Sequence, residues 1–512
     1  MSLWYDIDRV RRTETISKSV GKMRIIKMDD QELNKQYGLS QEIKKALHDL
    51  GYDTLTEVQQ AVIPLVFAQK DSIVQSQTGS GKTAAFAIPI CEKIIIEQKK
   101  PQVLVLTPTR ELAVQLKQEI SNIGRFKRIR CAAVFGRQRM ETQRRELQQR
   151  VHIVVGTPGR MLDHIERGNI SLDEIQYLII DEADKMLNMG FIEQVDAVIK
   201  GLPENRLTLL FSATMPDKIQ RICEKHMKDP VKIEIESEQL TFDTIHQVYY
   251  EVEAGNKFGL LTKILYLERP ESCIVFCNLR DTVDLLADKL KQKGFLCGTL
   301  HGGMEQIDRL DSIRDFKRGR FQFLVATDVA ARGLHIDDIS LVMNYDMPSD
   351  EESYVHRIGR TGRAGQLGTA VTLVTCHEYK ALQAIEKYID HTIPRLETPD
   401  YEAVEAGKEI FAKRAQKAPV LKADISEKLN KQITRLRINA GKKSKMRPGD
   451  ILGAITAIEG IHAENIGIIT IQDTCSYVEI LGDKGALVMQ ALLKSKIKGK
   501  IHTIKEVGFF CK

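Results

Sequence analysis

The sequence contains no run of about eighteen consecutive apolar residues, the length that a membrane-spanning helix requires. Residues 1–30 also lack the short apolar core of a secretory leader. The nine cysteines are odd in number and scattered, and no two of them form a C-x-x-C pair. These absences argue against a membrane protein, a disulfide framework and a cysteine-rich metal site, and they favour the reducing cytoplasm.

Positive charge is concentrated near the end of the chain. The 512 residues together carry a net charge of +6. Between Lys431 and Lys512, 14 Lys and Arg residues stand against 7 Asp and Glu residues, so this segment carries +7 and the rest of the chain −1. A positive excess confined to one segment indicates a module that binds a polyanion, although a solvated lysine-rich surface has the same composition.

Short apolar runs alternate with helical periodicity from about Gln41 to Val374. Runs of this kind, bounded by turn or cap residues, are typical of strands buried on both faces of a parallel sheet. They fall into two series, SIVQS to LTLLFSAT and then CIVFCN to AVTLVT. We therefore expect two α/β lobes with parallel sheets, joined by a hinge at Glu234–Val248.

The end of the chain predicts a small α+β domain. A polar helix and a linker precede ITRLRIN, and the pattern from there reads strand, helix, two strands, helix and strand. Pro448 suits the first position of the first of these helices. We expect an N-terminal extension at 1–27, a first lobe at 28–237, a second lobe at 242–395, a linker at 396–429 and a C-terminal domain at 430–512.

A phosphate-binding loop is predicted at SQTGSGKT (Ser76–Thr83), between the strand SIVQ and an apolar helix. Glycines let backbone N–H groups turn toward phosphate oxygens, and the helix N-terminus adds partial positive charge. Lys82 would reach the β- and γ-phosphates, and Thr83 would hold Mg²⁺. The remaining loop residues expected to bind nucleotide are Gln77, Thr78, Gly79, Ser80 and Gly81.

Two further motifs complete the predicted phosphoryl-transfer chemistry. The tetrapeptide DEAD ends the strand YLII, where Asp181 would bind the nucleotide's Mg²⁺ and Glu182 would orient or deprotonate the attacking water. HRIGRTGR in the second lobe offers Arg360 and Arg363, whose guanidinium groups would stabilise transition-state charge from across a cleft. PTRELA, TPGR, SAT and ATDVAARG also stand at the carboxyl ends of strands, where open α/β sheets bind ligands.

With these motifs in order, the chain resembles the DEAD-box RNA helicases of superfamily 2 from about Gln31 to Leu396. The resemblance implies two RecA-like lobes in tandem that close on ATP and single-stranded RNA. It implies an RNA-stimulated ATPase that unwinds duplexes non-processively, with ATP and Mg²⁺ as cofactors. Each ligand would tighten the other, because both favour the closed state.

The resemblance also assigns roles to single residues. Gln59 would read adenine, Asp328 would contact the nucleotide, and Ser212 and Thr214 would couple hydrolysis to strand separation. The residues expected to contact the RNA backbone are Thr109, Arg110, Thr157, Gly159, Arg160, Gln306, Arg309 and Thr327.

The C-terminal segment resembles the RNA-binding domain of the DbpA-type (DbpA/YxiN-like) bacterial helicases, a divergent RNA-recognition-motif fold. That likeness implies a hairpin of 23S rRNA near the peptidyl-transferase centre as partner, a pre-50S particle as substrate, and a cytoplasmic, monomeric enzyme. Alternation in ITRLRIN and SYVEIL leaves one aromatic, Tyr477, on the outward face of the predicted sheet. Because one ring can stack on few bases, cations must supply much of the affinity for RNA. The expected contacts are Arg435, Arg437, Lys442, Lys443, Lys445 and Arg447.

Four departures from the family pattern leave alternatives open. Asn34 stands where the family has an aromatic that stacks on adenine, and His335 replaces a carboxylate near the ribose. Leu55 and Glu57 replace prolines before Gln59, which should loosen that turn. Phe135–Gly136 replaces two glycines near RNA. One alternative is therefore an RNA-binding assembly factor with a weak or vestigial ATPase, and another is a DNA translocase of the same superfamily.

Overall fold

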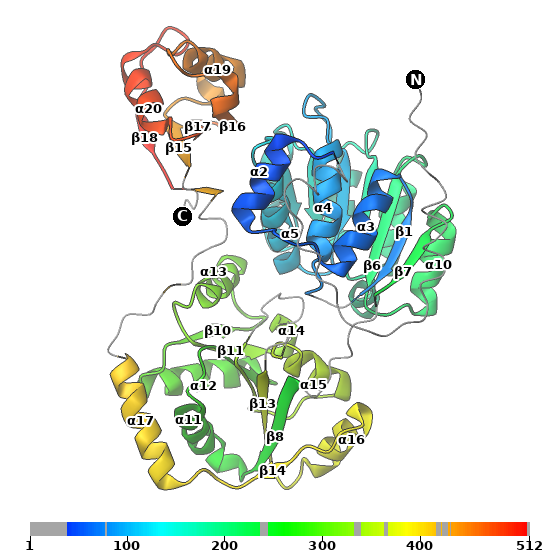
Figure 1. The fold of residues 1–512 in the computed structure, drawn as a ribbon, viewed down its shortest axis with the longest axis vertical. Coiled ribbons are helices and arrows are strands. Elements are labelled where there is room, and N and C mark those ends of the chain that lie inside the picture. The colour runs from blue at the N-terminus through cyan, green and yellow to red at the C-terminus, as the bar shows by residue number, and fades with distance from the viewer. Residues whose placement is uncertain are drawn as a thin grey trace.

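The computed structural model describes residues 38–76, 79–235, 244–331, 339–362, 367–415, 421, 429–430 and 432–508. Figure 1 shows three bodies in chain order, a blue to green lobe, a green to yellow lobe and an orange to red C-terminal domain. Several sequence expectations lie outside the described residues: the extension 1–27, Asn34, Gln77, Thr78, His335 and Arg363.

The first lobe is built on a seven-stranded sheet in the order β3-β4-β2-β5-β6-β1-β7, and all its pairings are parallel. Its strands are β1 (Ser72–Gln75), β2 (Val103–Leu106), β3 (Cys131–Val134), β4 (Ile153–Gly156), β5 (Tyr177–Ile180), β6 (Leu207–Ser212) and β7 (Val231–Glu234). The carboxyl ends of β5, β6 and β1 lie side by side, which brings the motifs that follow these strands together.

Helices cover both faces of this sheet. Alternate residues of β2 enter different cores, Val103 and Val105 on one face and Leu104 and Leu106 on the other, as period-two side-chain alternation requires. The helices are α2 (Gln41–Leu50), α3 (Glu57–Phe67), α4 (Lys82–Lys93), α5 (Arg110–Ile123), α6 (Met140–Leu147), α7 (Pro158–Glu166), α8 (Ala183–Asn188), α9 (Ile192–Lys200) and α10 (Asp217–His226).

The second lobe repeats this design with a parallel sheet in the order β10-β11-β9-β12-β13-β8-β14. Its strands are β8 (Ile245–Glu251), β9 (Cys273–Cys277), β10 (Cys297–Leu300), β11 (Phe323–Thr327), β12 (Leu341–Asn344), β13 (Gly368–Val374) and β14 (Arg395–Leu396). Its helices are η4 (Ala254–Asn256), α11 (Lys257–Glu268), α12 (Arg280–Gln292), α13 (Gln306–Lys317), α14 (Asp328–Ala331), α15 (Glu351–Ile358), α16 (Tyr379–Ile389) and α17 (Tyr401–Ala415).

The hinge expected at Glu234–Val248 is wrong at both ends. Glu234 closes β7, and Ile245–Val248 opens β8, which pairs along its whole length with β13. Polar residues obscured this strand, because IHQVYYE carries His246 and Gln247 near its start and contains no continuous apolar run. Residues 236–243, in the middle of the expected hinge, lie outside the described residues.

The C-terminal domain confirms the expected order of elements. Its antiparallel sheet has the order β16-β17-β15-β18, with α19 and α20 on one face. The elements are β15 (Ile433–Ile438), η5 (Lys442–Ser444), α19 (Pro448–Thr456), η6 (Ala463–Asn465), β16 (Ile466–Ile471), β17 (Ser476–Leu481), α20 (Gly485–Lys494) and β18 (Ile504–Glu506). Leu436 and Val478 face the helices, whereas Arg435, Arg437, Tyr477 and Glu479 share the opposite face of the sheet, here called the open face.

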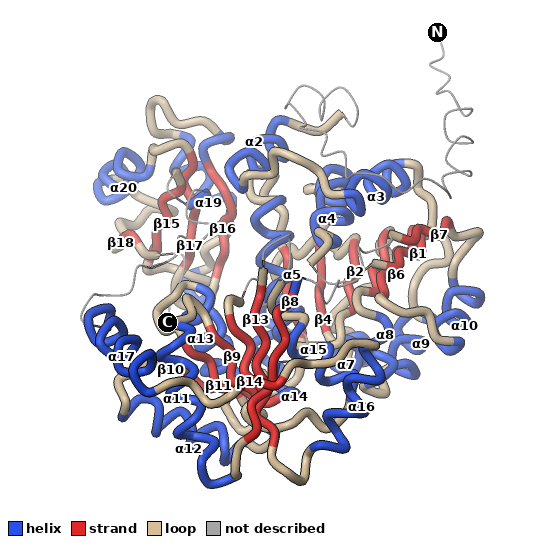
Figure 2. Tube along the Cα trace, turned by 60° about the horizontal axis from the view of Figure 1, so that its bottom comes forward, coloured by secondary structure: helices blue, strands red, loops and turns tan. Residues whose placement is uncertain are grey.

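The fold class expected from the sequence, two tandem parallel-sheet lobes and a small α+β domain, is confirmed. Figure 2 shows the three sheets as separate groups of strands. Among the described residues, no helix combines the length and apolar character needed to cross a membrane.

Candidate nucleotide and RNA sites

Gln59 supports the phosphate-binding loop from the side. A capping box at the start of α3 fixes it: the Thr56 side chain accepts from the Gln59 N–H, and the Gln59 side chain accepts from the Thr56 N–H at 3.0 Å. The buried Gln59 amide then donates to the Gly81 carbonyl at 3.2 Å. The turn before Gln59 is therefore held by this box, although the usual prolines are absent.

The loop itself approaches α4 through left-handed glycines. Gly81 has φ +88°, and a Cβ there would lie 2.6 Å from the Gln59 amide nitrogen, so only glycine fits. Lys82 follows as the first residue of α4, and its buried ammonium donates to the Ser76 carbonyl at 3.3 Å. Thr83 is half-buried beside it. The structure thus places a lysine, a hydroxyl and a helix N-terminus at the carboxyl end of β1, as expected.

Asp181 and Glu182 follow β5, two strands from β1 in the sheet order. Asp181 is buried, and among the described groups none donates a hydrogen bond to its Oδ1. Burial raises the pKa of Asp181 from 3.8 to about 6, and the Lys82 ammonium partly offsets this effect. Glu182 adopts a left-handed φ of +55°, and its Oε1 lies 2.5 Å from the Lys185 ammonium. Asp181 therefore lies within the field of the cation that starts α4, and Glu182 is paired with a cation of its own helix, α8.

The last residue of DEAD joins this motif to SAT. The Asp184 carboxylate accepts from the backbone N–H groups of Ala213 at 3.1 Å and Thr214 at 3.2 Å. In return, the Asp184 N–H donates to the Ser212 hydroxyl at 3.2 Å, and this hydroxyl donates to the Thr214 carbonyl. These hydrogen bonds tie the DEAD segment directly to SAT.

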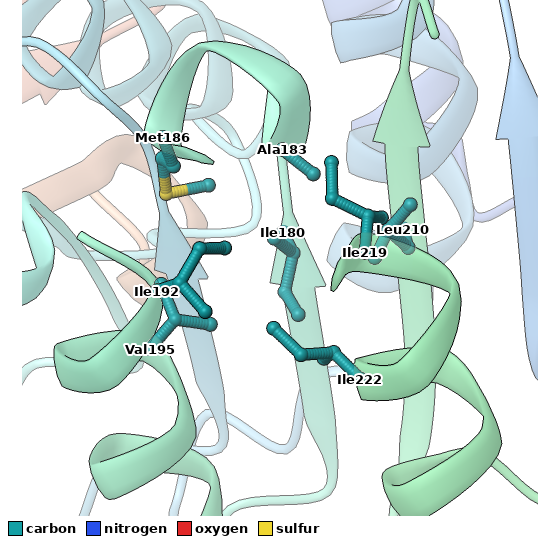
Figure 3. Close-up of a pocket in the computed structure, with 8 residues that line it drawn as sticks. All are labelled: Ile180, Ala183, Met186, Ile192, Val195, Leu210, Ile219 and Ile222. Carbon is teal, nitrogen blue, oxygen red and sulfur yellow. The ribbon is translucent and has the colours of Figure 1, made fainter. Parts of the chain in front are cut away.

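An apolar gap lies behind the DEAD segment. Figure 3 shows that the side chains of β5, β6, α8, α9 and α10 converge on it, among them Ile180, Ala183 and Met186. Its volume is about 10 Å³ and its lining is apolar, so it is a packing gap that offers no group to a nucleotide. The chemistry of this lobe is confined to the polar edge above it.

In the second lobe, a fully buried arginine organises the motifs. Arg357 binds both oxygens of Asp328, at 2.5 Å from Nε and 2.6 Å from Nη2, and its fork also reaches the Asn278 and Asn344 side chains. Arg360 follows one turn later, is mostly buried, and lines a small pocket together with Asp328 and Arg357. The Asp328 carboxylate was expected to contact the nucleotide. In this structure both of its oxygens accept hydrogen bonds from Arg357.

Four residues join the lobes at the expected RNA-binding edge. Arg110 of lobe 1 donates to the Gln306 side chain of lobe 2 at 3.3 Å. The Glu111 carboxylate accepts from the Gln306 amide and from Arg309, each at 3.0 Å. Burial lowers the pKa of Arg110, and the neighbouring cation of Arg137 adds to this effect. Two motifs that are far apart in the sequence therefore meet in space.

The other expected RNA contacts lie nearby in each lobe. Thr109 caps α5, with its hydroxyl accepting from the Leu112 N–H at 3.2 Å. Arg160 donates to the Gln138 carbonyl at 2.9 Å, and Gly159 has open space above its Cα. Thr157 precedes α7 and Thr327 ends β11, and both are largely buried.

Three family models match the chain in succession. They are the DEAD/DEAH box helicase at residues 56–222, the helicase conserved C-terminal domain at 256–365 and the DbpA RNA binding domain at 435–506. Over 466 residues the chain is 52% identical to the ATP-dependent RNA helicase DbpA of Bacillus subtilis strain 168, covering 91% of this chain and 97% of that protein. The chain is a DbpA-like DEAD-box ATP-dependent RNA helicase.

Other similarities agree with this assignment. The helicase is 46% identical over 377 residues to the DEAD-box ATP-dependent RNA helicase CshA of Geobacillus kaustophilus, covering 74% of this chain and 81% of that protein. A solved structure of S. cerevisiae Dbp5 bound to RNA and ADP BeF3 is 32% identical, with a TM-score of 0.64, and covers 75% of this chain and 99% of that one. The helicase is thus an ATP-hydrolysing enzyme with RNA as its partner.

In the C-terminal domain of this helicase, the expected RNA contacts fall into two groups. Arg435 and Arg437 lie on the open face, where the Arg435 guanidinium stacks over the Tyr477 ring at 4.5 Å from its centroid. The other contacts lie in the loop between β15 and α19, where the side chains of Lys442, Lys443, Lys445 and Arg447 are all exposed.

Sequence reasoning overlooked several residues that organise the site. Asp184 was present in the motif, but only the approach of β6 to β5 reveals its bonds to SAT. Arg357 precedes Arg360 by three residues, and this spacing on one helical face was the available signal. Lys185 and Glu111 carried no signal, because their partners depend on local backbone geometry and on contact between the lobes.

Proposed function

We propose that this helicase is anchored by its C-terminal domain to a hairpin of 23S rRNA near the peptidyl-transferase centre and remodels RNA in the assembling large ribosomal subunit. The match of residues 435–506 to the DbpA RNA binding domain carries the proposal. The exposed cations from Lys442 to Arg447 supply the charge that such a contact needs. A pre-50S substrate implies a cytoplasmic enzyme, and we propose that it acts as a monomer.

We assign the steps of ATP turnover to residues of both lobes. Lys82 holds the β- and γ-phosphates, Glu182 orients the attacking water, and Arg360 and Arg363 stabilise the transition-state charge when the lobes close. Asp184 transmits the change at DEAD to Ser212 and Thr214, since its carboxylate bonds to the SAT backbone. The placement of Lys82 at the start of α4 and of Glu182 shortly after β5 supports these roles, because both follow strands at the edge of the sheet where open α/β sheets bind ligands.

Mg²⁺ fits the nucleotide site. Asp181 offers a buried carboxylate oxygen that accepts no hydrogen bond from the described residues, and the Thr83 hydroxyl lies in the first turn of α4. A carboxylate, a hydroxyl and substrate phosphates are the ligands that this ion prefers. Bound there, Mg²⁺ would neutralise developing phosphate charge.

The proposal is tested by the ATPase rate with no RNA, a generic single strand and a 23S rRNA fragment carrying the hairpin. The measurement compares the full chain with a variant in which Lys442, Lys443, Lys445 and Arg447 are replaced by Ala. A control variant removes four exposed cations from lobe 2, at Lys289, Lys291, Lys293 and Arg320.

We expect the rRNA fragment to stimulate the full chain and the control variant strongly, and the loop variant no more than the generic strand does. Equal stimulation by all RNAs would contradict the anchoring. Absence of ATPase activity with every RNA would favour the assembly factor with a vestigial ATPase. A further reaction with single-stranded DNA addresses the translocase, which DNA stimulation would favour.

A further inference from the structure

An arginine-rich segment of lobe 1, residues 137–150, lies outside the sites described above. It comprises α6 and its flanking turns, and it exposes Arg139, Arg144, Arg145 and Arg150 to solvent. Glu141 pairs with Arg144 at 2.8 Å and with Arg145 at 3.2 Å, but these contacts are solvent-exposed and a phosphate can replace them. The four exposed arginines therefore form a basic surface, while Gln143 and Leu147 on the other side of α6 pack into lobe 1.

The segment begins at the RNA-binding edge. A Cβ at Gly136 would lie 3.6 Å from the Arg110 guanidinium. The Gln138 carbonyl accepts from Arg160, and Arg137 reaches across to the Gly302 carbonyl of lobe 2 at 2.9 Å. An RNA strand that leaves Arg110 and Arg160 therefore meets this segment first.

The other end of the segment reaches the C-terminal domain. The Gln149 side chain donates to the Ile471 carbonyl at 3.1 Å, and the Arg145 guanidinium lies 3.6 Å from the Asp473 carboxylate. The Lys443 N–H donates to the carbonyl of the same Asp473 at 2.9 Å. One residue, Asp473, thus links α6 to the basic loop Lys442–Arg447.

An apolar contact seats the C-terminal domain in this position. Ile433 and Leu481 pair at one end of the open face. They are buried in one cluster with Leu429, which precedes β15, and with Ala46 and Phe126 of lobe 1. Apolar residues on an otherwise polar face require such a cover. In Figures 1 and 2 the domain stands beside α2 of lobe 1, which carries Ala46.

Polar contacts surround this apolar centre. The Arg125 guanidinium lies 3.5 Å from the Glu479 carboxylate, and both side chains are largely buried. Arg130 donates to the Ile469 carbonyl on the edge strand β16, and Arg128 donates to the Ala463 carbonyl at 2.6 Å. Burial lowers the pKa of Arg125 and Arg130, so both cations have lost water and depend on these partners.

The basic loop keeps its cations in solvent while its backbone is fixed. The Lys442 N–H donates to the Gln472 carbonyl at 2.8 Å, and Lys498 donates to the Lys445 carbonyl at 2.6 Å. A Cβ at Gly441 would lie 2.2 Å from the Gln472 oxygen, so the turn into the loop requires glycine. A fixed backbone with exposed cations is preorganised for a phosphate chain.

We infer that docking of the C-terminal domain on lobe 1 joins the basic loop and the arginines of α6 into one phosphate-binding surface, which leads RNA from the anchored hairpin to the helicase edge at Arg110. This inference rests on the proposed function, since the hairpin supplies the anchor. In this arrangement the open face of the C-terminal domain contacts lobe 1, and the basic loop Lys442–Arg447 is left for RNA.

The test compares two RNAs on the full chain: the 23S rRNA hairpin fragment alone, and the same fragment with a flanking single strand of about ten nucleotides. Affinity is measured over a range of salt concentrations. One variant carries Arg139→Ala, Arg144→Ala and Arg145→Ala. A second carries Glu479→Arg, which breaks the docking contact while adding positive charge, and a third combines Glu479→Arg with Arg125→Glu to restore the pair.

We expect the α6 variant to bind the hairpin alone as the unmodified chain does, but to bind the extended RNA about tenfold more weakly, with a salt slope reduced by about 2. Glu479→Arg should also bind the extended RNA more weakly than the unmodified chain does, and the double variant should regain the affinity of the unmodified chain. The charge-matched control carries Lys289→Ala, Lys291→Ala and Lys293→Ala in lobe 2. This variant should bind the extended RNA as tightly as the unmodified chain does.

Unchanged binding of the extended RNA by the α6 variant would overturn the inference. So would a Glu479→Arg variant that keeps the benefit of the extension, or a double variant that fails to regain it. Circular dichroism confirms that each variant is folded. If the unmodified chain binds the hairpin alone no better than it binds unrelated RNA, the proposed function is wrong. That measurement does not depend on α6, so it separates failure of the proposed function from failure of this inference.

Discussion

Arg309 of lobe 2 and Glu111 of lobe 1 form an ion pair across the cleft. Two guanidinium nitrogens, Nε and Nη2, lie 3.0 Å and 2.9 Å from the same carboxylate oxygen, and both side chains are about nine-tenths buried. Arg309 is also one of the residues expected to contact the RNA backbone. The Glu111 carboxylate therefore pairs with a cation that an RNA phosphate would otherwise bind. In this structure the same pair joins the two lobes.

Glu111→Gln should raise the affinity for single-stranded RNA measured without nucleotide. The neutral amide competes less well for Arg309, and a charged hydrogen bond of about 1.5 kcal/mol corresponds to about tenfold in affinity. Fluorescence anisotropy with a labelled strand measures the effect. Glu166→Gln, an exposed substitution on α7, is the control. Unchanged RNA affinity would show that Glu111 and RNA do not compete.

Lys82→Ala and Glu182→Gln should each nearly abolish RNA-stimulated ATP turnover. The first removes the cation at the phosphates, and the second leaves the site neutral where water must be activated. Glu182→Gln should still bind nucleotide, because the loop and Lys82 are intact. Steady-state ATPase assays and nucleotide titration separate the two effects. The exposed Glu193→Gln is the matched control, and near-normal turnover in either site variant would refute the assigned role.

Arg360→Ala should lower the turnover rate by about 10³ if the guanidinium acts as a full arginine finger. ATP binding to lobe 1 should change little, since Arg360 belongs to the other lobe. Single-turnover kinetics with saturating RNA measures the loss. Arg320→Ala removes an exposed arginine from the same lobe and should be silent. A loss confined to nucleotide affinity would contradict a transition-state role.

Arg357→Ala should act mainly on stability. The substitution leaves the Asp328 carboxylate without its guanidinium partner and also removes the bonds from Arg357 to Asn278 and Asn344. Removing one partner of a buried ion pair typically costs about 3–5 kcal/mol. Urea denaturation should detect this loss in the free energy of unfolding. Arg314→Ala, which breaks a half-exposed pair with Asp311, should cost much less. Equal stability of the two variants would mean that Arg357 is not structurally required.

Nucleotide binding in the presence of Mg²⁺ should weaken in acid. The pKa of Asp181 is raised to about 6 by burial, so a proton increasingly occupies the carboxylate below that pH. The apparent affinity should fall about tenfold per pH unit below about pH 6 and level off above about pH 7. Asp181→Asn should bind weakly with little pH dependence. A profile that stays flat down to pH 5 in the unmodified chain would refute the assignment.

The same shift has a consequence for folding. The folded-state pKa of Asp181 lies above its ordinary value, so burial of the charged carboxylate destabilises the fold at neutral pH, and this cost disappears as pH falls below about 4. The site therefore keeps a strained carboxylate that a bound cation would relieve.

The local chemistry of this helicase was readable from single segments. A strand, a glycine loop and a helix in succession locate Lys82, and a buried strand before DEAD locates Asp181. The alternation in ITRLRIN correctly placed Leu436 and Arg435 on opposite faces. The sequence pattern placed the start of β8 in a hinge, because His246 and Gln247 interrupt the apolar run that marks the other strands, and the pairing with β13 is not visible in the local sequence.

Two parallel-sheet lobes, their catalytic motifs and a basic terminal domain follow from local patterns in the sequence, because buried strands, turns and caps depend on neighbouring residues. Three ion pairs become visible in the folded chain alone: Arg357 with Asp328, Arg309 with Glu111, and Arg125 with Glu479. These pairs join residues far apart in the chain. Their partners are set by how whole elements pack, which no local pattern encodes.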